Sequence, residues 1–177
     1  RPETVEALLA FARRLERGGA RLRTVHLPPG LEAAVVLQAR LSAFELRQSL
    51  AHERRWHHER LSPRLQQRVE AEADLSMAGY AELRSSMRAA QREAASLFDD
   101  ADVLLYPAAD GEAEVGMETG SPRYGGLWTF LHLPVLSLPM GRGPAGLPLG
   151  AQLIGAPGRD LDLLAAAVFA EGCAAVG

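Results

Sequence analysis

Three short apolar segments in the second half of the chain constrain its fold more than any other feature. They cover residues 103–106, 134–139 and 147–154, and each is bounded by proline or glycine. Proline cannot donate to a sheet ladder, so it is typical of strand ends. Residues 103–106 are wholly apolar and follow a helical segment directly, so we expect a strand buried on both faces. The pattern predicts a sheet of core strands.

Most of the remaining sequence has apolar residues at the spacing of α-helices. The predicted helices cover residues 3–17, a region of roughly 31–60, residues 76–98, residues 124–132, and a closing segment from Asp160. Gly18 and Gly19 end the first helix, and a short strand is expected over residues 20–27. Helices that alternate with strands in this way predict the α/β class.

The helix boundaries rest on capping residues. Ser62 and Pro63 interrupt the second helical region, and Ser76 is a suitable N-cap for the third. Asp160 is expected to cap the closing helix, with Leu161, Leu164 and Val168 facing inward.

The composition of the chain excludes several classes of function. Lysine is absent, so the 19 basic residues are all arginine. Chemistry that needs a lysine amine is therefore impossible within this chain. The single cysteine, Cys173, excludes an internal disulfide, and the net charge of −3 gives no reason to expect nucleic acid. No apolar run approaches the ~20 residues of a membrane span. The chain opens at Arg1 without an initiator methionine, which suggests a piece of a longer protein.

Two motifs resemble binding sites but favour simpler interpretations. Residues 141–146 match G-x-G-x-x-G, yet Pro144 removes one amide and the chain continues extended, so a connection between two strands is favoured over a dinucleotide site. His52 and His57 lie five residues apart, about 140° around a helix, where zinc binding needs a spacing of four. A solvated helix face is favoured over a metal site.

No complete catalytic set is evident. Gly-x-Ser-x-Gly does not occur, and Ser85 and Ser86 lie in a helical context without glycine. A Ser-His-Asp arrangement that uses His132 remains open. The same is true of an unrelated hydrolase with His132 or Asp102 as its base. Asp102 and its acidic neighbours are more simply a solvated loop, and Cys173 a small packed residue.

Residues 102–171 resemble the C-terminal part of the amidase signature family. The matching motifs are D-x-L-L-x-P at 102–107, Y-G-G-L-W-T at 124–129, L-P-V-L-S-L-P at 133–139 and G-L-P-x-G-x-Q-L-x-G at 146–155. The last is the most specific. The upstream half is similar more loosely, through the Gly19-Ala20 turn, Tyr80 and Arg88. The resemblance implies the C-terminal part of an α/β/α fold with a mixed β-sheet flanked by helices.

The family resemblance also implies a chemistry. Members hydrolyse carbon–nitrogen bonds of linear amides with a nucleophilic serine, a bridging serine held by a cis peptide, and a neutral lysine base. These groups belong to the family's N-terminal half, and neither the lysine nor the glycine- and serine-rich loop is present here. We therefore expect no catalytic residues and no metal or cofactor in this chain.

The same resemblance places the loop of residues 107–123 and the following helix at the wall of the acyl pocket. Trp128, Thr129 and Tyr106 are the candidate substrate-pocket residues. A role for Trp128 as a core anchor is an equal alternative. Gly125 stands where the family often has asparagine, which weakens any substrate contact normally made there.

The domain prediction is a single partial domain over residues 1–177. Residues 1–100 would be mainly helical with one strand, and residues 101–177 would hold sheet strands, a long glycine-rich loop and the closing helix. The expected partners are the missing N-terminal catalytic portion, a small-molecule amide and a second copy in a homodimer; nucleic acid and membrane are not expected. The expected location is the cytoplasm. The alternative function is a degenerate, non-catalytic amidase-like structural or interaction module.

Overall fold

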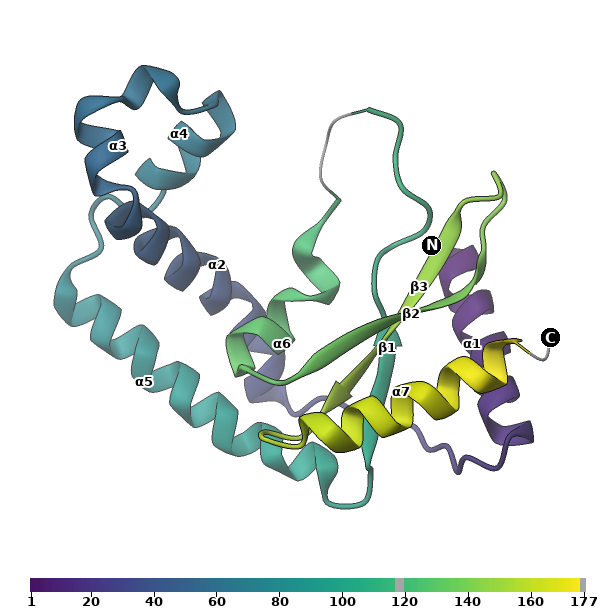
Figure 1. Ribbon diagram of the computed structural model, residues 1–177. Helices are drawn as coiled ribbons and strands as arrows, with labels where there is room; N and C mark the ends of the chain where they lie inside the picture. Colours follow the sequence, from purple (N-terminus) through teal and green to yellow (C-terminus); the bar gives the residue numbers. More distant parts are fainter. Residues whose placement is uncertain (117–119, 176–177) are drawn as a thin grey trace.

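The computed structural model describes residues 1–116 and 120–175, which form helices around a three-stranded sheet (Figure 1). The main elements are α1 (Pro2–Arg17), α2 (Pro29–Ser49), α3 (Ala51–Trp56), α4 (Pro63–Glu70), α5 (Met77–Ala94), β1 (Val103–Pro107), α6 (Gly126–Leu131), β2 (Val135–Arg142), β3 (Pro148–Gly155) and α7 (Asp160–Ala175). Short 3-10 turns cover His58–Arg60, Ala95–Phe98 and Pro122–Tyr124. The predicted α/β class is confirmed.

The strands lie in the order β1-β3-β2, and both pairings are antiparallel. Tyr106 of β1 lies opposite Gln152 of β3. β2 and β3 form a hairpin whose turn holds Gly146 at a φ of +82°, a left-handed conformation that favours glycine. The G-x-G-x-x-G motif is thus a strand connection, as the sequence favoured.

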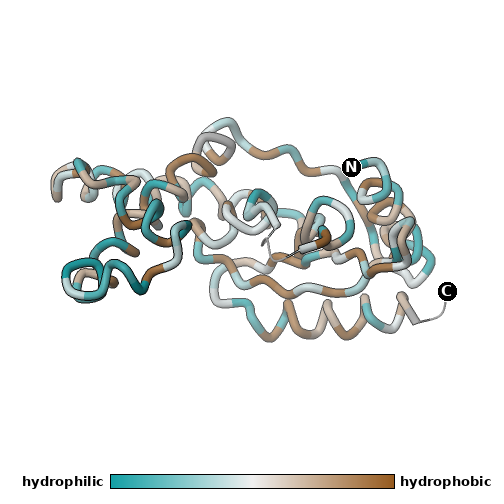
Figure 2. The backbone as a smooth tube through the Cα atoms, turned by 90° about the horizontal axis from the view of Figure 1, so that it is seen from above, coloured by the Kyte–Doolittle hydropathy of each residue, from teal (hydrophilic) through white to brown (hydrophobic). Residues whose placement is uncertain are grey.

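The sheet separates two layers of helices and two apolar clusters. α1 and α7 cover one face, where Phe11, Leu149 and Leu153 are buried. α2, α5 and α6 lie on the other side, where the core includes Trp128 and Ile154. Figure 2 shows the sheet from above, with α7 along its outer side and running to the C-terminus.

Serine caps begin two of the helices. Ser76 accepts a hydrogen bond from the Gly79 amide at 3.1 Å and starts α5, as predicted. Ser62 accepts from the Leu65 amide at 3.4 Å, and Pro63 occupies the first turn of α4. The pair therefore separates two helical stretches, as predicted, and it also begins a helix of its own, because proline at the first helical position is favourable.

The strand predicted over residues 20–27 is absent. α1 ends at Gly18 and Gly19, where Gly19 has a φ of +106° and the Ala20 amide returns to the Leu15 carbonyl at 3.0 Å. Residues 21–28 then run without regular secondary structure to α2. A strand needs a hydrogen-bonded neighbour, and no described segment pairs with these residues.

The facing of α7 differs from the prediction. Leu163, Ala167 and Ala170 face the sheet and are at most 5% exposed. Leu161, Leu164 and Val168, predicted to face inward, lie on the outer side. Apolar residues occupy nearly every turn of this helix, so its periodicity could not identify the buried face.

The outer strands are less buried than predicted. β1 is mostly half-buried, with Leu104 as its buried residue, and Val135 of β2 is 41% exposed. Both strands lie at edges of the three-stranded sheet, so each has one neighbour. Among the described residues, none of the helices combines the length and apolar character that a bilayer crossing requires.

Candidate functional site

Aromatic residues from three elements meet on the sheet face below α6. Tyr106 on β1 meets the Trp128 ring edge to face, with ring centroids 5.6 Å apart at 83°. Tyr124, just before α6, lies 5.7 Å from the Tyr106 ring at 52°. Such tilted geometries are the favourable ones for aromatic pairs. The structure thus brings together two of the three residues that the sequence assigned to the pocket.

Gln152 joins this cluster to the loop above it. Its side chain is 4% exposed, and Nε2 donates to the Pro107 carbonyl at 2.9 Å and to the Tyr124 carbonyl at 2.7 Å. These two carbonyls stand at the two ends of the long glycine-rich loop. One side chain from the central strand therefore holds both ends of the loop against the sheet.

Only a weak sequence signal points to Gln152. It is the polar residue within the buried run of β3, and a buried amide must find hydrogen-bond partners. Its acceptors are backbone carbonyls, which no residue type reveals. We name the group of Tyr106, Tyr124, Trp128 and Gln152 the aromatic cluster.

Thr129 lies apart from the aromatic cluster. Its side chain is exposed, and Oγ1 donates to the Gly125 carbonyl at 3.0 Å, one turn back along the helix. The hydroxyl proton is therefore already used by α6. Trp128 next to it is 2% exposed, and its Nε1 lacks an acceptor among the described residues.

A positively charged side chain lies beside the aromatic cluster. The Arg123 guanidinium carbon stands 5.7 Å from the centroid of the Tyr124 ring, at the exposed end of the loop. Stacking of arginine on an aromatic face contributes about 0.5–1 kcal/mol at exposed sites. The aromatic cluster thus combines packed aromatic rings with a positively charged side chain, Arg123, on its exposed side.

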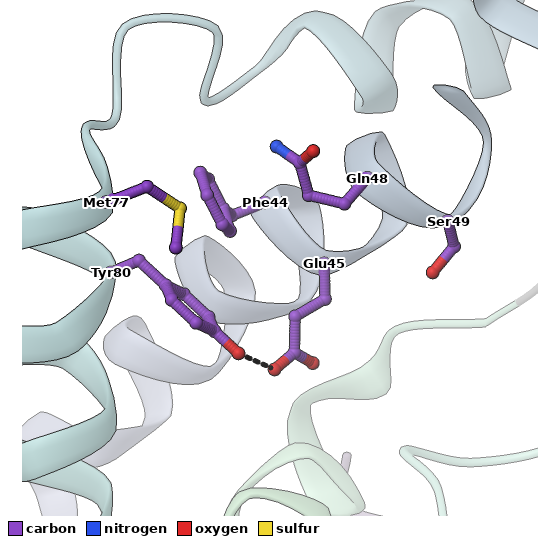
Figure 3. Close-up of a pocket in the computed structure, with 6 residues that line it drawn as sticks. All are labelled: Phe44, Glu45, Gln48, Ser49, Met77 and Tyr80. Carbon is purple, nitrogen blue, oxygen red and sulfur yellow. Dashed lines mark hydrogen bonds between the residues drawn. The ribbon is translucent and has the colours of Figure 1, made fainter. Parts of the chain in front are cut away.

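A shallow hollow lies between α2 and α5, away from the aromatic cluster but on the same side of the sheet. It has a volume of about 480 Å³ and is open to solvent; Figure 3 shows its lining residues, which are Phe44, Glu45, Gln48, Ser49, Met77 and Tyr80. Sequence reasoning did not identify it, since its residues carry no motif beyond Tyr80.

Tyr80 and Glu45 form the polar side of the hollow. The Tyr80 hydroxyl donates to Glu45 Oε1 at 2.9 Å, and Arg84 Nη1 lies 3.5 Å from the same oxygen. The Tyr80 ring stacks on Phe44 with centroids 4.7 Å apart. The hydrogen bond to Glu45, together with burial and the charge of that carboxylate, raises the pKa of Tyr80. The group is therefore a neutral hydrogen-bond donor rather than a base.

Among the residues that the structure describes, the other candidates do not gather into a metal site. The His52 and His57 rings are 5.4 Å apart, but no group of three or more metal ligands gathers within residues 1–116 and 120–175. His132 is exposed in a left-handed conformation after α6, with a φ of +56°. Asp102 is exposed in the loop before β1, and Cys173 is half-buried beside Gly18.

Comparisons with known proteins agree with this architecture. A model of the Amidase family matches residues 1–164. The 2-amino-5-chloromuconic acid deaminase of Comamonas testosteroni is 29% identical over 182 residues, which cover 96% of this chain and 39% of the deaminase. A glutamyl-tRNA(Gln) amidotransferase subunit of Geotalea daltonii is 38% identical over 78 residues, covering 40% of this chain and 16% of the amidotransferase polypeptide.

A solved structure points to the same family. A crystal structure of an amidase superposes with a TM-score of 0.82 and 28% identity, covering 95% of this chain and 42% of its own. The chain therefore spans 39% of the deaminase and 42% of the amidase, with which it aligns over nearly its whole length. The resemblance noted from the motifs is confirmed, and the chain belongs to the amidase family.

Proposed function

We propose that this chain is the C-terminal portion of an amidase that hydrolyses carbon–nitrogen bonds of linear amides, and that it forms one partial domain over residues 1–177. The observation that carries this proposal is the family match over residues 1–164 in a chain without lysine. The mechanism implied by the family needs a neutral lysine to accept a proton through a bridging serine. That base must come from outside these 177 residues.

The contribution of this chain would be scaffold and one wall of the substrate pocket. The half-buried Tyr106 offers an aromatic surface that the buried Trp128 supports from below, and Gln152 fixes the ends of the loop above it. A buried donor without an acceptor is costly. Trp128 Nε1, unpaired among the described residues, is such a donor, and because it is shielded from solvent it supports a role for Trp128 as a core anchor beneath the pocket wall.

Thr129 would contribute at most as a hydrogen-bond acceptor, because its proton is committed to Gly125. The proposed partners are the N-terminal catalytic portion, covalently attached, and a small-molecule amide. A homodimer belongs to the same proposal.

Two measurements test the proposal. The purified chain should release no ammonia or aniline above the buffer rate from simple linear amides and anilides. The same chain extended by the upstream reading frame should release it, and that frame should encode a lysine and a glycine- and serine-rich loop. Turnover by the 177-residue chain that His132→Ala abolishes would overturn the proposal in favour of an independent hydrolase. An upstream frame without these residues would favour the non-catalytic module.

A further inference from the structure

The turn between β2 and β3, residues 143–147, satisfies only some of its own backbone amides. The Gly143 amide donates to the Leu147 carbonyl at 2.9 Å, and the Gly146 amide donates to the Gly143 carbonyl at 3.0 Å. Pro144 has no amide hydrogen to place. The amides of Ala145 and Leu147 are therefore left for an acceptor outside the turn.

Glu112 of the glycine-rich loop supplies that acceptor. Its Oε1 accepts from the Leu147 amide at 2.7 Å and from the Ala145 amide at 3.1 Å, and its Oε2 also lies 3.1 Å from the Ala145 nitrogen. Hydrogen bonds from backbone amides to an ionised carboxylate are stronger than those between neutral groups. One half-buried carboxylate thus satisfies both remaining amides of the turn.

Two glycines of the G-x-G-x-x-G motif make this contact possible. A Cβ at Gly143 would lie 2.5 Å from Glu112 Cδ and 2.6 Å from Glu112 Oε1, which is closer than atoms can pack. Gly146 has a φ of +82°, and amides in turns with such a residue converge on an anion. The motif therefore has the backbone features of a site for a carboxylate.

The charge of the hairpin suits a negative group. Arg142 is the only charged residue between residues 135 and 155. Its Nη1 donates to the Gly146 carbonyl at 2.7 Å, so the guanidinium braces the turn and adds a positive charge to it. Complementary charge of this kind favours the correct pairing over others.

The contact fixes the first part of the loop at a second point. The Ala108 amide donates to the Gly150 carbonyl at 2.8 Å where the loop leaves β1, and Glu112 reaches the turn four residues later. Between them, Gly111 has a φ of +88°, which changes the direction of the chain. In Figure 1 the loop bends toward the hairpin of β2 and β3 after it leaves β1.

We infer that the turn of residues 143–147 is a carboxylate-binding site, and that Glu112 occupies it and holds residues 108–112 against the hairpin. Glu112 is thus a positioning residue for the loop. Both partners belong to this chain, so the contact does not depend on what a longer amidase adds. Its importance for a pocket wall rests on the proposed function, but the contact itself does not.

Proton–nitrogen NMR of the full 177-residue chain tests the contact through the amides of Ala145 and Leu147. In Glu112→Ala both proton signals should move upfield, and both amides should exchange with water several-fold faster, because their acceptor is gone. The matched control is Glu114→Ala, which removes a carboxylate of the same loop that bonds to Arg1 instead of the turn. This control should leave both signals in place. Unchanged signals in Glu112→Ala would overturn the inference.

Gly143→Ala tests the site from the other side. It keeps the carboxylate but takes away its room, so it should shift the same two amides and lower the urea midpoint of unfolding. In a Glu112→Ala background the same change should have no further effect, because the clashing side chain is absent. Fully additive effects of the two changes would overturn the inference.

Sodium acetate tests whether the turn binds a carboxylate that is not part of the chain. Added to Glu112→Ala, it should return the Ala145 and Leu147 signals toward their wild-type positions and reach saturation, whereas sodium chloride at equal ionic strength should not. The wild type should not respond, because Glu112 occupies the site. The absence of any return, or equal shifts with both salts, which would indicate charge screening alone, would overturn the assignment of the site. None of these readouts involves amide hydrolysis, so their failure is distinguishable from a failure of the proposed function.

Discussion

The two hydrogen bonds of Gln152 make a quantitative prediction for the loop that they close. Gln152→Leu keeps the side chain about the same size but removes both donors, so the Pro107 and Tyr124 carbonyls lose their partner. Each unsatisfied buried acceptor costs about 1–3 kcal/mol. Both residues are half-buried, so water reaches the carbonyls in part and the lower half of that range applies. We expect a total loss of about 2–4 kcal/mol from the two carbonyls, or about 4–16 °C in Tm for a chain of this size.

Two assays separate the global effect from the local one. Thermal and urea unfolding give the loss of stability. Limited trypsin digestion reports on the loop, since Arg123 is its only trypsin site and lies next to the anchored Tyr124 carbonyl. Cleavage there should become several-fold faster in Gln152→Leu.

The matched control is Gln67→Leu, the same change at an exposed position of α4, which should stay within about 0.5 kcal/mol of the wild type. Equal stability of the two variants, or unchanged cleavage after Arg123, would refute the role that we give to Gln152.

Two further predictions concern a tyrosine and a turn. Tyr80→Phe removes the donor to Glu45 and should cost about 1 kcal/mol near neutral pH by urea unfolding, whereas Tyr124→Phe should cost less. The folded-state pKa of Tyr80 is raised above its ordinary 10.0. The stabilisation that this hydroxyl provides is therefore complete below about pH 10 and is lost as the pH rises through the folded-state pKa. The wild type should lose more stability than Tyr80→Phe at alkaline pH, and parallel curves of stability against pH would contradict this. Gly146→Ala should cost about 1 kcal/mol because of the φ of +82°, whereas Gly120→Ala, which also has open space around its Cβ but no positive φ, should be neutral in thermal unfolding; equal effects would exclude backbone strain as the cause.

The ends of strands and the starts of helices were predictable where a single residue type decides the backbone conformation. Pro107 marked the end of β1, and Ser76 marked the start of α5. The segment 20–27 could not be judged in this way, because its composition suits a strand and only a neighbouring strand would make it one. Likewise α7 was predicted as a helix, but with the wrong face buried, because both of its faces are apolar.

The candidate site was predictable only in part, for a related reason. Tyr106 and Trp128 were expected near one another from the family resemblance, and they are in contact. The role of Gln152 depends on carbonyl groups brought together by folding. The exposed position of Thr129 depends on which side of α6 packs on the core, which a helix of six residues does not reveal.

The attachment of the loop has a consequence for how such enzymes diversify. Gln152 bonds to main-chain oxygens, so the side chains at positions 107 and 124 are not specified by the attachment itself. The entropy of closing a loop grows only slowly with its length. Insertions and substitutions between the two anchor points can therefore accumulate at little thermodynamic expense, so a new substrate preference could evolve there while the underlying strands stay unchanged.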